Sequence, residues 1–153
     1  MVASLLQNGA ESVKIIDGTY IYDVYTFPVA KLLQVPSAHK KKGSYDVGHN
    51  KKFVRYKNII TAFDIETTRI KEIEQSIMYI WQWQFQGIGC VIGRTWQEFI
   101  YFCEKLNKRL PKNTMIVVFD HNLSYEFQFL AGIYDFKPDD VFCIDNRKIL
   151  YCN

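Results

Sequence analysis

Residues 59–68 read IITAFDIETT, and this stretch decides the fold. Residues 59–65 are mostly apolar or β-branched, which is typical of a strand buried within a sheet. Side chains alternate along a strand, so we expect Phe63 and Ile65 to point into the core and Asp64 and Glu66 to share the opposite side. The stretch therefore combines a core strand with a pair of acids on one side of it.

The paired carboxylates of Asp64 and Glu66 need a neutralising partner. Like charges on one side of a buried strand repel each other and are costly to bury. A divalent hard cation such as Mg²⁺ or Mn²⁺ neutralises them well, because such cations prefer oxygen ligands. The alternative is a strand end at which both acids are simply solvated, and a D-x-E pattern this short also arises by chance.

A second polar segment follows another short apolar run, where residues 119–129 read FDHNLSYEFQF. Asn122 is placed to cap the helix that follows, and Glu126 then lies about one turn further on, on nearly the same face. A third carboxylate could thus reach the acids at 64 and 66 from a helix start. The alternative is that Asn122 is only a cap and that Glu126 only interacts favourably with the helix dipole. Asp120 is expected to point differently and is left out of the site.

The remaining pattern predicts a mixed α/β domain. Strands are expected at 76–85 and 90–92 around a turn at Gly87 and Gly89, because residues 77, 79, 81, 83 and 85 alternate as apolar residues. Thr95 and Glu98 form a capping box, which predicts a helix that ends at Pro111. Further predicted elements are a short buried strand at 115–119, a helix at about 123–131, and two strands within 141–152.

Composition restricts the class of protein. The chain has 153 residues, of which 48% are hydrophobic and 23% charged, so it has material for one globular core and is not a disordered tail. No apolar run reaches the length of a membrane span and no signal-peptide pattern opens the chain, so no membrane partner is expected. The four cysteines have no CxxC spacing, which predicts reduced thiols in a cytoplasmic protein.

Residues 1–57 differ from the rest and are expected to form a basic, partly irregular extension with one or two short strands, one of them at 20–27. Residues 40–57 hold seven Lys and Arg against one Asp, a net charge of +6, whereas the rest of the chain carries a net −3. Such a stretch suggests contact with a polyanion. The alternative, which composition alone favours, is a solvated linker.

Taken together, FDIETT at 63–68 and HNLSYEFQFL at 121–130 resemble the first two exonuclease motifs of family-B DNA polymerases, and most closely those of the protein-primed, phage-type branch. The first family motif is D-x-E followed by Thr, and the second is H-N-L-x-(F/Y)-D with an aromatic residue three positions later. The resemblance covers about residues 58–150. It implies a ribonuclease-H-like (DnaQ-like) exonuclease fold over residues 58–153, a mixed sheet with flanking helices that is incomplete at its C-terminus.

The resemblance also implies a chemistry and a set of roles. The activity would be two-metal, Mg²⁺- or Mn²⁺-dependent hydrolysis of DNA 3′ ends, the proofreading reaction of DNA replication. The implied metal ligands and catalytic groups are Asp64, Glu66 and Glu126. The residues implied to hold the single-stranded 3′ end are Thr67, Asn122, Tyr125 and Phe129, and His121 and Leu123 are further implied DNA-binding residues. Further implied partners are a separate polymerase chain or a terminal protein, in the host cytoplasm of a bacteriophage.

Two departures from the family pattern matter. Glu126 stands where the family has Asp, which keeps a hard oxygen ligand and predicts a shifted metal. The third family motif, Y-x-x-x-D, has no counterpart after Glu126, since Tyr134 and Asp139 are spaced one residue too far apart, and the polymerase portion is absent. The chain therefore resembles the N-terminal piece of such a polymerase. The alternatives are a catalytically inactive DNA-binding remnant and a freestanding ribonuclease-H-like nuclease.

Overall fold

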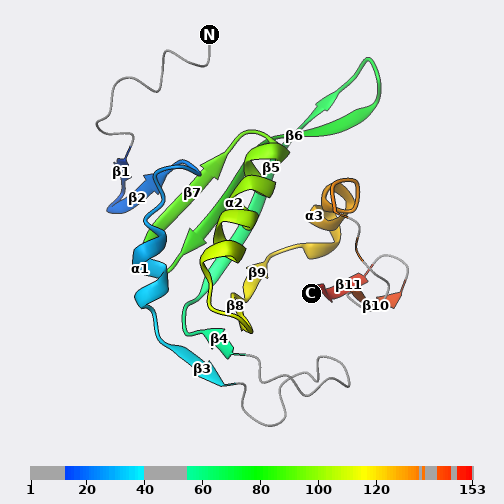
Figure 1. The fold of residues 1–153 in the computed structure, drawn as a ribbon. Helices are drawn as coiled ribbons and strands as arrows, with labels where there is room; N and C mark the ends of the chain where they lie inside the picture. The colour runs from blue at the N-terminus through cyan, green and yellow to red at the C-terminus, as the bar shows by residue number, and fades with distance from the viewer. Residues whose placement is uncertain (1–12, 40–54, 135, 137–140, 146–147, 153) are drawn as a thin grey trace.

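The computed structural model describes residues 13–39, 55–134, 136, 141–145 and 148–152. Their centre is a mixed six-stranded sheet with the order β1-β2-β7-β6-β5-β9, flanked by helices (Figure 1). Its strands are β1 (Lys14–Ile16), β2 (Thr19–Tyr22), β7 (Gly89–Gly93), β6 (Gln75–Phe85), β5 (Thr61–Ile70) and β9 (Val118–Asp120). The predicted mixed α/β class is confirmed.

The antiparallel pair of β5 and β6 is the longest part of the sheet and contains residues 61–68 of the stretch IITAFDIETT. Phe63 pairs with Trp83, and Ile65 pairs with Trp81, so their buried side chains share one face. A β-bulge lies between Glu66 and Thr67, where Glu66 pairs with Ile80 and Thr67 with Met78. The residue between Ile80 and Met78 has no partner on β5.

This bulge changes which face the side chains of β6 occupy. In the sequence, Ile77 and Tyr79 continue the apolar alternation of Trp81. In the structure both are exposed, whereas Met78 packs against the core. The strand predicted at 76–85 is confirmed, and the extra residue at its bulge inverts the alternation, so that Met78 takes the core side.

Helix α2 (Trp96–Arg109) lies across the buried face of the sheet (Figure 1). The predicted capping box is confirmed: Thr95 accepts a hydrogen bond from the backbone N–H of Glu98, and Glu98 accepts one from that of Thr95. Phe99 and Phe102 of α2 pack among the aromatic residues of β5 and β6, with the Phe99 ring 5.1 Å from that of Phe63.

Trp81 fixes the position of α2 over the sheet. It is fully buried, and its Nε1 donates a hydrogen bond to the backbone oxygen of Thr95 at 2.9 Å, just before the helix begins. Gly93 lies beneath its indole ring, where an added Cβ would come within 2.3 Å of the ring atoms. A larger residue at 93 is therefore incompatible with Trp81 in this position.

The described part of residues 1–57 belongs to the same core. Strand β2 pairs in parallel with β7, and helix α1 (Val29–Gln34) contributes Val29 and Leu32 to the buried cluster. The expected strand at 20–27 stops at Tyr22, because Asp23 accepts hydrogen bonds from the backbone of the next residues and turns the chain. Helix α1 was not predicted, and the segment is less irregular than the sequence suggested.

Smaller elements complete the fold. A three-stranded sheet has the order β3-β4-β8, with β3 (Ser37–His39), β4 (Arg55–Lys57) and β8 (Thr114–Met115), and β10 (Val141–Asp145) pairs with β11 (Lys148–Cys152) as predicted. The strand expected at 115–119 divides into β8 and β9 and is not buried, since Phe119 is 58% exposed. Within the described residues, no helix combines the length and apolarity needed to cross a bilayer.

Candidate functional site

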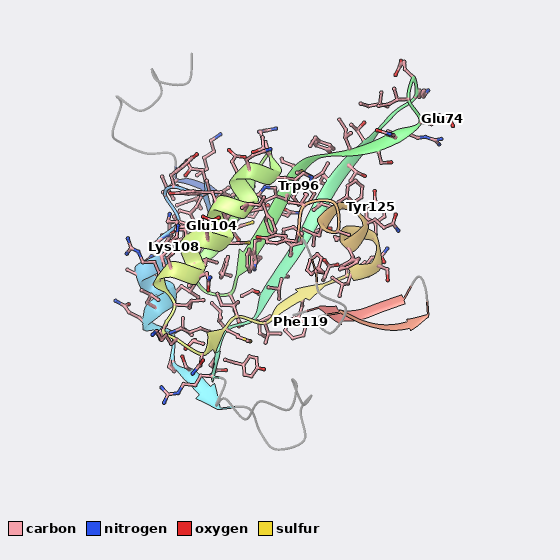
Figure 2. The ribbon with its side chains drawn as sticks, turned by 45° about the vertical axis from the view of Figure 1, so that its right-hand side comes forward. Glu74, Trp96, Glu104, Lys108, Phe119 and Tyr125 are labelled. Atoms are coloured by element: carbon pink, nitrogen blue, oxygen red, sulfur yellow. The ribbon has the colours of Figure 1, made fainter. Side chains whose placement is uncertain are left out.

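The two segments that carry the candidate site residues meet at one edge of the sheet. Strand β9 pairs in parallel with β5, which places Asp120 level with Phe63. Helix α3 (Leu123–Leu130) follows β9 directly and lies beside the β5 edge, as Figure 2 shows with Tyr125 labelled on this helix. Thr67 of β5 and Tyr125 of α3, 58 residues apart in the chain, share a hydrogen bond of 2.6 Å between their hydroxyl groups.

Asp64 and Glu66 are both exposed, in agreement with the side predicted for them. Oδ1 of Asp64 accepts a hydrogen bond from the backbone N–H of Ile65 at 3.0 Å. Its Oδ2 accepts one from Nε2 of Gln82, across the β5–β6 ladder, at 3.4 Å. These contacts fix the Asp64 carboxylate on the face of the sheet opposite Phe63.

Glu126 is the buried acid of the site. Its side chain is 3% exposed, and its Oε2 accepts no hydrogen bond from any described donor. Burial raises the pKa of the Glu126 carboxyl to about 7, and the nearby carboxylates of Asp120 and Asp64 add to the rise. Glu126 therefore lies close to Asp64, whereas Glu66 is not among the groups that act on it.

Asp120 belongs to the same group of acids, and the expectation that it points away from the site is wrong. Its carboxyl lies within hydrogen-bonding reach of that of Glu126, and burial raises its pKa, an effect that the backbone N–H of Asn122 partly offsets. That N–H donates to Oδ1 of Asp120 at 2.8 Å. The available signal in the sequence was an acid at the end of an apolar strand, immediately before the second motif.

The other residues of the second motif surround these acids on α3 and on the turn before it. His121 and Asn122 are exposed, and Leu123 is half-buried. Asn122 occupies the predicted N-cap position, but its side chain makes no capping hydrogen bond, and its backbone N–H donates to Asp120 in the preceding turn. The rings of Tyr125 and Phe129 meet edge to face, with centroids 5.3 Å apart.

The basic stretch at 40–57 is described only from residue 55 onward. Arg55 is exposed, whereas Lys57 is buried and donates from Nζ to the backbone oxygens of Leu33 and Val35 at 2.8 and 2.7 Å. Burial lowers the pKa of Lys57. Lys57 therefore stabilises the packing after α1, and its ammonium group is not available to bind a polyanion. The prediction for residues 40–54 lies outside the described part of the chain.

The carboxylate oxygens are suitable ligands for a hard divalent cation, but too few of the described side chains converge on one point to surround a cation. Within the described part of the chain, no three Asp, Glu, His or Cys side chains are placed so that together they could hold a metal ion. The feature that does fit a cation is the buried Oε2 of Glu126, which lacks a partner and lies near the carboxylates of Asp64 and Asp120.

Comparisons of this chain with protein-family models, with curated proteins and with solved structures find no match.

Proposed function

We propose that this chain carries the 3′–5′ exonuclease site of a DNA polymerase of the family-B, protein-primed type, and that it hydrolyses the 3′ ends of single-stranded DNA. One observation carries the proposal. The two segments that resemble the first two exonuclease motifs, far apart in the sequence, lie side by side and are joined by the hydrogen bond between Thr67 and Tyr125. This contact brings Asp64 and Glu126 into one electrostatic group.

The order of the strands supports the proposed ribonuclease-H-like fold. Strands β7, β6 and β5 form an antiparallel meander, and β9 then adds in parallel to β5 after helix α2. In such an arrangement the acids of β5 and the start of the helix after β9 come to the same edge of the sheet. The motif residues are therefore positioned by the sheet itself and by one short turn.

The residues in this arrangement have separable tasks. Asp64, Glu66 and Glu126 are the carboxylates proposed to hold divalent cations, which in two-metal hydrolysis activate water and stabilise the leaving oxygen. The rings of Tyr125 and Phe129 offer faces and edges against which a terminal base can stack, an interaction of about 1–3 kcal/mol per base. Exposed His121 and Asn122 offer hydrogen bonds to the DNA backbone, with Thr67 and Leu123 beside them.

The experiment is an Mn²⁺-dependent degradation assay on 3′-labelled single-stranded DNA. We expect the wild-type chain to shorten the DNA from its 3′ end and the double variant Asp64→Ala/Glu66→Ala to leave it intact. Glu72→Gln, an exposed acid at the tip of the β5–β6 hairpin, is the matched control and should keep full activity. Degradation by the double variant at the wild-type rate would contradict the proposal.

A second candidate function is DNA binding without catalysis. The observation that favours it is that no three ligating side chains of the described residues are placed to hold a metal ion. In that case the wild-type chain should shift single-stranded DNA in a low-salt gel and leave it undegraded at every Mn²⁺ concentration. Tyr125→Phe and Phe129→Ala would then change the shift, whereas Asp64→Ala would not weaken it.

A further inference from the structure

We propose that Asp120 is an additional cation ligand of this site and binds a divalent metal ion together with Glu126. The inference rests on the proposed function and extends it to a residue that neither of the resembling motifs contains.

The sheet places Asp120 at the point where the other acids gather. Asp120 is the last residue of β9 and is aligned with Phe63, the residue before Asp64 on the adjacent strand. Helix α3 starts three residues later, so Glu126 comes back over the end of β9 in its first turn. The carboxyl groups of Asp120 and Glu126, from a strand end and a helix start, thus come within hydrogen-bonding reach of each other, and Asp64 is near enough to act on both.

The carboxylate of Asp120 is held in place by the turn. Its Oδ1 accepts the backbone N–H of Asn122, a short side-chain-to-backbone contact that fixes its direction. One oxygen is used in this way, and the carboxylate still has lone pairs to offer toward Glu126, whose carboxyl is within hydrogen-bonding reach. The Asp120 side chain is half-buried, so an ion can reach it from solvent.

Glu126 supplies the independent observation that points to a ligand. Its Oε2 is buried and accepts no hydrogen bond from a described donor, and the group next to it is another carboxyl. No Lys or Arg forms an ion pair with Asp64, Asp120 or Glu126 among the described residues. Once Glu126 is ionised, its buried oxygen faces another carboxyl and no cationic side chain, so a positive ion from solvent is the partner that the ionised site lacks.

The test measures Mn²⁺ binding to the full chain in the absence of DNA, by titration calorimetry and by the electron paramagnetic resonance signal of free Mn²⁺. Asp120→Asn keeps an oxygen for the N–H of Asn122 but loses the charge, and we expect it to bind Mn²⁺ at least about tenfold more weakly than wild type. Glu126→Gln should show a similar loss, and Glu72→Gln at the hairpin tip should bind as wild type does. Thermal unfolding verifies that each variant is folded.

The outcomes separate the two proposals. If folded Asp120→Asn binds Mn²⁺ as tightly as wild type while Glu126→Gln binds it weakly, Asp120 is not a ligand and the proposed function stands. If the loss at Asp120 is found but wild type does not degrade DNA, the ligand assignment stands and the exonuclease does not. Absence of Mn²⁺ binding by wild type overturns both. Should Asp120→Asn fail to fold, Asp120→Ser, whose hydroxyl oxygen can still accept the N–H of Asn122, is measured instead, and unchanged affinity there overturns the inference.

Discussion

The two halves of the β5–β6 ladder belong to the same pair of strands but have different surroundings. The base, residues 61–66 with 80–85, lies under α2 and buries alternate side chains, and Trp81 and Phe85 are fully enclosed. The arm, residues 67–79, projects beyond α2 and the neighbouring strands, with Glu74 at its tip (Figures 1 and 2). Ile73 and Ile77 of the arm are 54% and 42% exposed.

The difference teaches that the alternating pattern specifies a strand but does not decide whether the strand is buried. Burial in the base depends on the helix that covers it. The boundary between base and arm is the bulge after Glu66, and it is there that Thr67 meets Tyr125 of α3. The candidate site therefore lies where the packed part of the ladder passes into the solvated part.

The largest expected effect comes from truncating the base. Trp81→Ala should lower the free energy of unfolding by about 3–5 kcal/mol, because it empties a fully buried site and removes the hydrogen bond to Thr95. The matched change in the arm, Ile77→Ala, should stay within about 0.5 kcal/mol of wild type. Urea unfolding followed by tryptophan fluorescence and circular dichroism measures both, and equal losses would mean that the arm is packed in solution.

A second prediction concerns the acid at the boundary. The pKa of Glu126 is raised from 4.5 to about 7 in the folded protein, so between these pH values the folded state keeps a proton that the unfolded chain loses. The free energy of unfolding should therefore fall as pH rises through this window, by roughly 2–3 kcal/mol. The raised pKa of Asp120 acts in the same direction.

Variants at the boundary and in the arm test whether Glu126 is the group that causes this pH dependence. Glu126→Gln should remove most of the decline between pH 4.5 and 7, since its amide does not titrate. Glu72→Gln, in the arm, should keep the wild-type profile. Thermal unfolding recorded across the pH range measures the effect, and a decline that persists in Glu126→Gln would assign it to another group.

The smallest of the expected effects involves one hydroxyl in each half. Oγ1 of Thr61 accepts the Nε1 hydrogen of Trp83 at 3.1 Å inside the core, so Thr61→Val should cost about 1–2 kcal/mol by leaving that donor buried without a partner. Thr68→Val, on the exposed part of the arm, should change stability by less than about 0.5 kcal/mol. Chemical denaturation of both variants shows whether the contrast between base and arm extends to polar groups.

Much of the fold could be predicted from local patterns. The capping box at Thr95 and Glu98, the hairpin turn at Gly87, and the strand at 76–85 each depend on residues close together in the sequence, and each is confirmed. Helix α1 was missed because it is only six residues long and lies between Pro28 and Pro36. Those prolines suggest interruption, yet proline is well tolerated at a helix start and after a helix end.

The candidate site was predictable in its residues but not in its geometry. Alternation placed Asp64 and Glu66 correctly on the exposed side of β5. It could not show that Asp120 turns toward Glu126, because that direction is set by a hydrogen bond to Asn122 within a turn. The bulge after Glu66 was likewise invisible, since an extra residue in one strand is recognised only against its partner strand.

Because Gly93 lies against the Trp81 indole, the size of the residue tolerated at 93 depends on the size of the residue at 81. A side chain can be introduced at 93 only where the residue at 81 has become smaller, so the two substitutions should rescue each other and neither should be neutral alone. A distant relative with a larger residue at 93 is therefore expected to have a smaller one at 81, its partner on the adjacent strand. The pair therefore offers a signature by which such relatives could be identified.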